Sequence, residues 1–82
     1  MVHLRRGFIR WLHDVMTSMK NYSLKTWIMY SARLDYKRLK LVLEYLVNVG
    51  AVEEVDGEYF LTEKGRTALR HLRKFMELMN IE

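Results

Sequence analysis

Basic and apolar side chains lie together in the segment after Asp35, and their types suit contacts with phosphate and with base edges. They are Tyr36, Lys37, Arg38, Lys40 and Leu41. Lysine and arginine bind phosphate oxygens and guanine edges, and a leucine can contact a thymine methyl group. On a helical wheel with the leucines inward, Lys37, Leu41 and Glu44 point outward, and Lys40 and Arg38 flank that face. The pattern is that of a surface that binds nucleic acid or of an ordinary solvated helix face.

Lys25 and Thr26 form a second candidate contact, at the expected start of an earlier helix. The N-terminus of a helix leaves backbone N–H groups free, and a nearby lysine adds positive charge, so phosphate can bind there. The alternative is that Thr26 only supports the start of the helix. Tyr36 is equally open, because its ring can either contact a base or pack against this earlier helix.

Residues for other chemistry are not found at useful spacing. His3, His13 and His71 are far apart in the sequence, and the chain contains no cysteine. Neither a glycine-rich phosphate loop nor a nucleophile motif is present. We therefore expect a protein that is not an enzyme and has no metal site, no cofactor and no evident small-molecule ligand.

The elements that must position these residues follow from periodicity and turn residues. Apolar residues at helical spacing predict helices over 6–19, 25–33, 36–49 and 62–79. Ser23 and Asp35 are the expected caps of the second and third helices. Asp56-Gly57 between the β-prone runs 52–55 and 58–61 predicts a tight hairpin. Gly65 either permits a close approach of another backbone or simply weakens the last helix.

The charges are segregated along the chain. Residues 1–40 carry a net charge of +7, residues 41–63 carry −6 and residues 64–82 carry +3, which sum to +4. The expected hairpin is therefore acidic, with Glu53, Glu54, Asp56 and Glu58 on or beside it. Runs of apolar residues are too short for a membrane span or a signal peptide, so we expect a cytoplasmic protein. Within the cytoplasm we expect it on the nucleoid, or in the host cytoplasm if a virus or plasmid encodes it.

Two motifs resemble a known family. Lys25-Thr26-x-Ile28-Met29-Tyr30-x-Ala32-x-Leu34-x-Tyr36 and Gly57-x-Tyr59-x-Leu61-Thr62-x-Lys64-Gly65 are similar to the archaeal winged-helix group. That group includes the ten-kilodalton DNA-binding proteins of Sulfolobus-type archaea and regulators of archaeal viruses and plasmids. The resemblance covers residues 23–66. It implies a mostly helical α+β winged helix-turn-helix domain over 1–82, binding to double-stranded DNA, and dimers formed through the C-terminal helix.

The apolar residues exceed what one small core can bury. We expect the surplus to form a homodimer surface made by Trp11, Leu69, Leu72, Phe75, Met76 and Met79. The alternative is a monomer whose last helix folds back on its own body. We expect Tyr30, Tyr45 and Tyr59 to lie in or near the core, and Trp11 and Trp27 to pack.

The leading hypothesis is a sequence-specific DNA-binding homodimer, a transcriptional regulator with helix 36–49 in the major groove. Two alternatives remain open. One is an architectural chromatin protein that reads little sequence, and the other is a protein-interaction module that docks a basic partner on the acidic wing. The specificity ratio separates the two DNA-binding roles, and binding to duplex DNA at two salt concentrations tests the third.

Overall fold

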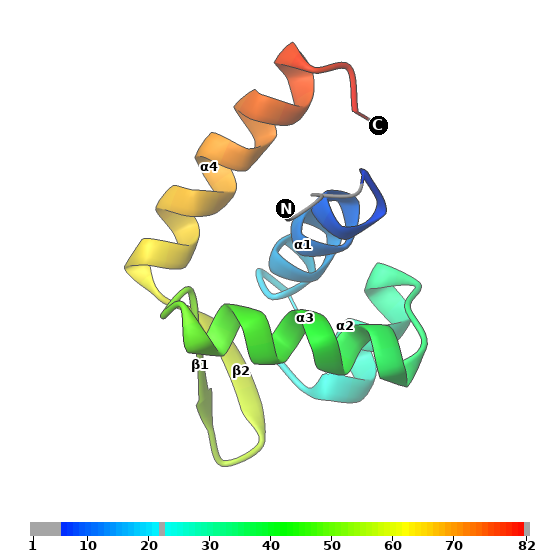
Figure 1. Ribbon diagram of the computed structural model, residues 1–82. Helices are drawn as coiled ribbons and strands as arrows, with labels where there is room; N and C mark the ends of the chain where they lie inside the picture. The colour runs from blue at the N-terminus through cyan, green and yellow to red at the C-terminus, as the bar shows by residue number, and fades with distance from the viewer. Residues whose placement is uncertain (1–5, 22, 82) are drawn as a thin grey trace.

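The computed structural model describes residues 6–21 and 23–81, which form four helices and one antiparallel hairpin (Figure 1). The elements are α1 (Arg6–Ser18), α2 (Lys25–Ala32), α3 (Tyr36–Asn48), β1 (Val52–Val55), β2 (Glu58–Leu61) and α4 (Glu63–Leu78). The predicted mostly helical α+β winged helix-turn-helix fold is confirmed, and each helix bound lies within one residue of its predicted position.

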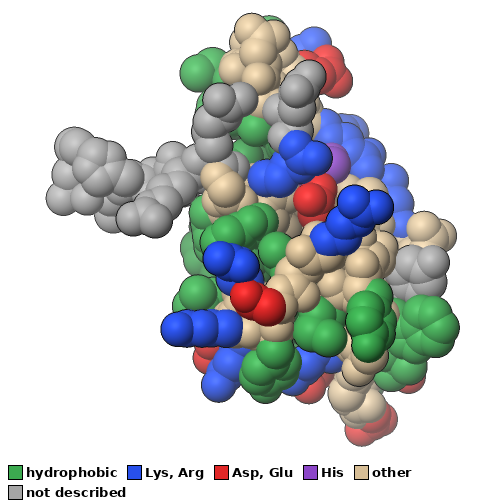
Figure 2. Space-filling model, turned by 90° about the vertical axis from the view of Figure 1, so that its right-hand side faces the viewer, with side chains coloured by type: hydrophobic (Ala, Val, Ile, Leu, Met, Phe, Trp, Pro, Cys, Tyr) green, Lys and Arg blue, Asp and Glu red, His purple; other side chains and the backbone are tan. Residues whose placement is uncertain are grey.

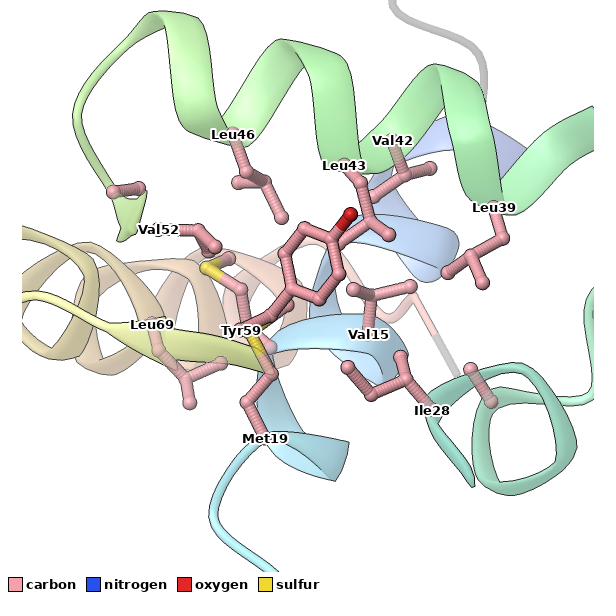
Figure 3. Close-up of a cluster of buried hydrophobic side chains, with 13 residues drawn as sticks. Val15, Met19, Ile28, Leu39, Val42, Leu43, Leu46, Val52, Tyr59 and Leu69 are labelled. Carbon is pink, nitrogen blue, oxygen red and sulfur yellow. The ribbon is translucent and has the colours of Figure 1, made fainter. Parts of the chain in front are cut away.

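Helix α1 is the hub of the packing, because α2, α3 and α4 all contact it. The hairpin continues from α3 and leads directly into α4, which extends away from it (Figure 1). The core draws on every element. Its residues are Val15, Met16, Met19, Ile28, Ala32, Leu39, Val42, Leu43, Leu46, Ala51, Val52, Tyr59 and Leu69. Figure 3 shows the ring of Tyr59 lying beneath α3, with its hydroxyl group beside Leu43.

Turn residues fix the connections around α3. The Asp35 carboxylate caps this helix by accepting a hydrogen bond from the Arg38 backbone N–H at 2.8 Å. Gly50, just after the helix, has φ 81°, a left-handed conformation that glycine adopts without strain. Asp56 and Gly57 have φ 50° and 81°, as a tight hairpin turn requires.

Ser23 does not cap α2, so that prediction was wrong. The N-cap residue is Leu24, which makes no side-chain cap bond. The Ser23 hydroxyl instead donates to the Glu58 carboxylate at 2.9 Å, and the Tyr59 N–H donates to the Ser23 carbonyl at 2.7 Å. Pairing with β2 therefore takes the serine away from the helix and ties the hairpin to the start of α2.

Gly65 allows a close backbone approach at the start of α4. A Cβ atom at this position would overlap the carbonyl oxygen of Ala51. The Gly65 N–H also donates to the Thr62 hydroxyl, which caps α4, at 3.0 Å. Of the two alternatives for this glycine, close approach is the correct one, and it sets how α4 leaves the hairpin.

Candidate functional site

Helix α3 presents a long face to solvent. Leu39, Val42, Leu43 and Leu46 are buried against the body. The opposite side exposes Lys37, Lys40, Leu41 and Glu44. Leu41 is 54% exposed, and within the described chain Lys37 and Lys40 make no hydrogen bond or ion pair. The structure thus brings the predicted outward residues together on one accessible surface.

Arg38 lies on a different side of α3 from these lysines. Its guanidinium group donates to the Asp35 carboxylate at 3.0 Å and lies 5.4 Å from the ring of Trp11. The contact with Trp11 directs it toward α1, and the bond to Asp35 occupies part of its hydrogen-bonding capacity. Arg38 therefore stands at the edge of the α3 surface, next to α1.

Trp11 is half-buried, because Phe8 packs edge-on against it and Arg38 covers its ring. The centres of the Phe8 and Trp11 rings are 6.3 Å apart. Phe8 also contacts Tyr45 edge-on, at 5.7 Å. This small aromatic cluster joins α1 to α3. Packing was the expected role for Trp11, and the structure agrees, although part of the indole remains accessible.

Lys25 and Tyr36 contact each other where α2 meets α3. The Lys25 ammonium group lies 5.2 Å from the centre of the Tyr36 ring, a cation–π contact. Tyr36 is exposed, so its ring does not pack into the body. Thr26 is exposed on the first turn of α2. The predicted α2 contact residues therefore adjoin the N-terminal end of α3.

A cleft of about 300 Å³ separates α3 from the hairpin. Its charged lining residues are Lys25, Lys40, Glu44 and Glu54. Tyr59 closes the cleft at the bottom, and burial raises the pKa of its hydroxyl above the ordinary value of 10. The Glu54 carboxylate also raises this pKa, whereas the Lys25 ammonium group lowers it. The hydroxyl is therefore neutral at physiological pH, so two lysines and two glutamates carry the charge of the cleft.

The hairpin is acidic and exposed at its tip. Glu53, Asp56 and Glu58 all reach solvent, and no basic residue lies between 52 and 61. On the outer face of the strands, Phe60 pairs with Glu53. A hairpin of this charge repels phosphate, in contrast to the basic side chains of α3.

Two aromatic residues of α2 are not buried as expected. Tyr30 is 72% exposed, and Trp27 is also exposed. Helix α2 has only eight residues, and Ile28 and Ala32 take its buried inward positions, so Trp27 and Tyr30 lie outside the core. Tyr45 is about half exposed, and only Tyr59 of the three tyrosines lies in the core.

Helix α4 divides its apolar residues between two faces. Leu69 and Met76 are 2% and 7% exposed, because they pack onto the body of the same chain. They supply no accessible apolar area, in contrast to the expectation for a dimer surface. The position of each residue around the helix axis explains the difference. Leu69 and Met76 lie on the side of α4 that packs on α1, whereas Leu72, Phe75 and Met79 lie at the edge of this contact or outside it.

Four accessible apolar residues of α4 and its C-cap repeat at alternating spacings of four and three. They are Ala68, Leu72, Phe75 and Met79, and Leu78, which is 70% exposed, lies outside this repeat. Phe75 is 43% exposed and Met79 is 59% exposed, while Leu72 is half-buried. Sequence periodicity alone cannot separate Ala68 from Leu69, and the structure exposes Ala68 and buries Leu69. We call this set the α4 seam, and its spacing is that of a coiled-coil contact.

The described residues offer no group of three or more acidic, histidine or cysteine side chains that could hold a metal ion. Nor is any helix among them long and apolar enough to cross a membrane.

The profile of the winged helix-turn-helix family matches residues 5–80 of the chain. Two uncharacterized proteins of Methanocaldococcus jannaschii are similar in sequence. MJ0290 is 32% identical over 77 residues, which cover 93% of this chain and 36% of that protein. MJ0287 is 32% identical over 57 residues, which cover 70% of this chain and 59% of that protein. The chain thus spans between about one third and three fifths of these relatives.

Two solved structures have a similar fold. Sso10a-2, a DNA-binding protein from Sulfolobus solfataricus, superposes with a TM-score of 0.77 at 24% identity, over 88% of this chain and 80% of that one. The O-methyltransferase NcsB1 of neocarzinostatin biosynthesis superposes with a TM-score of 0.60 at 22% identity. That match covers 82% of this chain but only 24% of the enzyme, so it concerns one part of the enzyme.

Proposed function

Because the chain belongs to the winged helix-turn-helix family, we propose that it binds double-stranded DNA with α3 in the major groove, as a non-enzymatic transcriptional regulator. The observation that carries the proposal is the exposed face of α3, where Lys37, Lys40 and Leu41 are accessible and the two lysines have no partner within the described chain. A recognition helix contacts base edges mainly through its N-terminal residues, where these side chains lie.

The composition of this face favours sequence reading over uniform attraction to phosphate. Leu41 can contact a thymine methyl group, and Glu44 can accept a hydrogen bond from cytosine N4. Tyr36 and Lys25 extend the surface toward α2, where the lysine supports the aromatic ring. Acidic groups in the cleft and on the hairpin weaken non-specific binding, because they repel any backbone that the base contacts do not hold in place.

An architectural role is the second candidate. Sso10a-2, whose fold is similar, is a DNA-binding protein, and DNA binding by itself is compatible with an architectural role. The two roles differ in the specificity ratio and not in bare affinity. A protein-interaction role for the acidic hairpin is the remaining alternative, and it requires that duplex DNA does not bind to α3.

The α4 seam supports a homodimer as the working form of the protein. Its exposed Phe75 and Met79 form an apolar edge that a single chain leaves in water. Two chains joined along α4 cover this edge. A two-fold dimer also presents two copies of α3, and adjacent major grooves on one side of a duplex lie about 34 Å apart.

Two measurements test the proposal in sequence. The first is a gel shift with random duplex DNA at two salt concentrations, and binding that weakens with salt supports the DNA-binding role. The second is selection of bound sites from a random pool. Enrichment of one motif supports a regulator, whereas binding without enrichment supports the architectural role. Absence of binding at low salt eliminates both and leaves the interaction role.

A further inference from the structure

A shallow groove between the end of α1 and α4 carries a second concentration of positive charge. The described residues that line it are Lys20, Arg66, Leu69, Arg70 and Arg73, around a volume of about 190 Å³. Four of these five side chains are basic, and we call these four the α4 basic groove. The proposed contact of α3 with DNA uses none of them.

The α4 basic groove is separate from the outer face of α3, because no residue of α3 lines it. Helices α3 and α4 each pack on α1, and α3 directs Leu39, Val42 and Leu43 toward the body. In Figure 2 basic side chains gather at the lower left and, separately, along the upper right edge. The α3 face and the α4 basic groove are therefore two separate basic surfaces of the chain.

Two of the arginines are held in place by the body of the protein. Arg66 donates to the Leu61 carbonyl at 3.2 Å, and Arg73 donates to the Thr17 hydroxyl at 3.4 Å. A guanidinium group has five N–H donors, so each arginine keeps others for a ligand. Holding the side chain in advance reduces the entropy lost on binding.

Lys20 and Arg70 complete the groove with mobile charges, since both are exposed and neither makes a hydrogen bond or ion pair within the described chain. Arg66, Arg70 and Arg73 stand at i, i+4 and i+7 on one side of α4, which covers about 10 Å along the helix axis. Three arginines in such a row can contact neighbouring phosphates of one DNA strand.

No acidic residue of α4 lies between Arg66 and Arg73. Glu63 precedes this stretch, and Glu77 lines the adjoining hollow together with Arg10 and Arg73. The groove thus fits a linear polyanion whose charges repeat along one direction. Since the groove offers no apolar or aromatic side chain beyond Leu69, it reads charge and not bases.

We propose that the α4 basic groove binds the phosphate backbone of a second DNA segment while α3 holds the first. This inference rests on the proposed DNA-binding function of α3. It gives each chain two DNA contacts on separate surfaces, so the protein can hold two duplex segments together without a second α3.

The experiment is a two-duplex capture assay with the full chain. A biotinylated duplex of about 20 base pairs, two helical turns, is fixed on beads and loaded with protein. A fluorescent duplex of the same sequence is then added, and the captured fraction is measured. Binding of the protein to one duplex is measured separately by fluorescence anisotropy.

The variant that tests the groove is Lys20→Gln with Arg70→Gln, because both side chains are exposed and the fold does not use them. Capture should fall at least about tenfold at 0.15 M salt, since loss of one phosphate contact costs about fivefold there. Affinity for one duplex should change less than twofold. Lys74→Gln, at an exposed position of the same helix that does not line the groove, is the control for Arg70→Gln alone and should capture like the parent.

Three results overturn the inference. One is a parent protein that binds a single duplex but captures no second one. Another is normal capture by the folded groove variant, which assigns capture to two α3 helices of a dimer. The third is an equal loss of single-duplex affinity and capture, which places both surfaces on one duplex. A parent protein that binds no duplex at all contradicts the proposed function itself, so the two failures are distinguishable.

Discussion

Replacing Lys37 and Lys40 with alanine should weaken DNA binding and make it less sensitive to salt. Both side chains are exposed on the outer face of α3, and neither has a partner within the described chain. Their removal therefore takes away two positive charges without leaving a buried group unpaired. Alanine also has the best helix propensity, so α3 should retain its structure.

The size of the effect follows from counterion release. Each phosphate contact contributes about 0.9 to the slope of log K against log salt, so the double variant should lose about 1.8 from that slope. Relative to binding at 1 M salt, one phosphate contact raises the affinity about fivefold at 0.15 M salt, and two contacts raise it about thirtyfold. At 0.05 M salt the same two contacts raise the affinity about two hundredfold. The difference between variant and parent should therefore shrink as salt rises.

The assay is fluorescence anisotropy with one labelled duplex at four salt concentrations between these limits. The control variant replaces Lys20 and Lys74 with alanine, which removes the same charge from outside α3. Both lysines are exposed, and neither side chain makes a hydrogen bond or ion pair within the described chain. Thermal unfolding of all three proteins shows whether the fold is intact.

A folded double variant with the parent's affinity and slope refutes the placement of DNA on α3. An equal loss in the control variant refutes it as well, because the effect then reflects net charge alone. A loss of affinity with an unchanged slope indicates that the lysines contact bases rather than phosphates.

Four further predictions follow from the same structure. Glu54→Lys should raise affinity for random duplex DNA by about fivefold, because the residue lines the cleft beside α3; a fall in affinity indicates a favourable contact made by the carboxylate. Gly65→Ala should destabilise the protein by more than about 2 kcal/mol in urea unfolding, since its methyl group would overlap the Ala51 carbonyl, and a neutral result contradicts the close approach. Phe75→Glu should convert a dimer of twice 10.0 kDa to a monomer in sedimentation at micromolar concentration, and a monomeric parent rules out the dimer. Tyr59 has a raised pKa in the folded state, so its stabilising effect is complete below pH 10 and is lost as the pH rises through the folded-state value; Tyr59→Phe should reduce the alkaline fall in Tm, and parallel curves contradict this.

The sequence by itself determined the order of the elements, because each depends on local chemistry. Leucines at helical spacing mark the inward face of α3, and Asp35 can cap it through its own backbone neighbourhood. The Asp56-Gly57 turn needs two residues that accept positive φ, and few dipeptides supply them. The outward position of Lys37, Lys40 and Leu41 also follows from the period of the helix alone.

The tertiary structure decided which of several similar residues serves which surface. Leu69 and Ala68 are neighbours in the sequence, but the direction in which α4 leaves the hairpin buries one and exposes the other. That direction depends on contact between Gly65 and Ala51, which are fourteen residues apart. Local periodicity cannot show which element covers a helix, so it could not assign the α4 seam.

Long-range contacts also changed the roles of polar residues. Ser23 binds Glu58 across 35 positions instead of capping α2, and Arg38 turns to Trp11 on another helix. The α4 basic groove joins Lys20 to arginines about fifty residues later. Such partners come into contact only when the helices pack. Burial of the apolar faces determines how the helices pack, and this packing determines which polar side chains become neighbours.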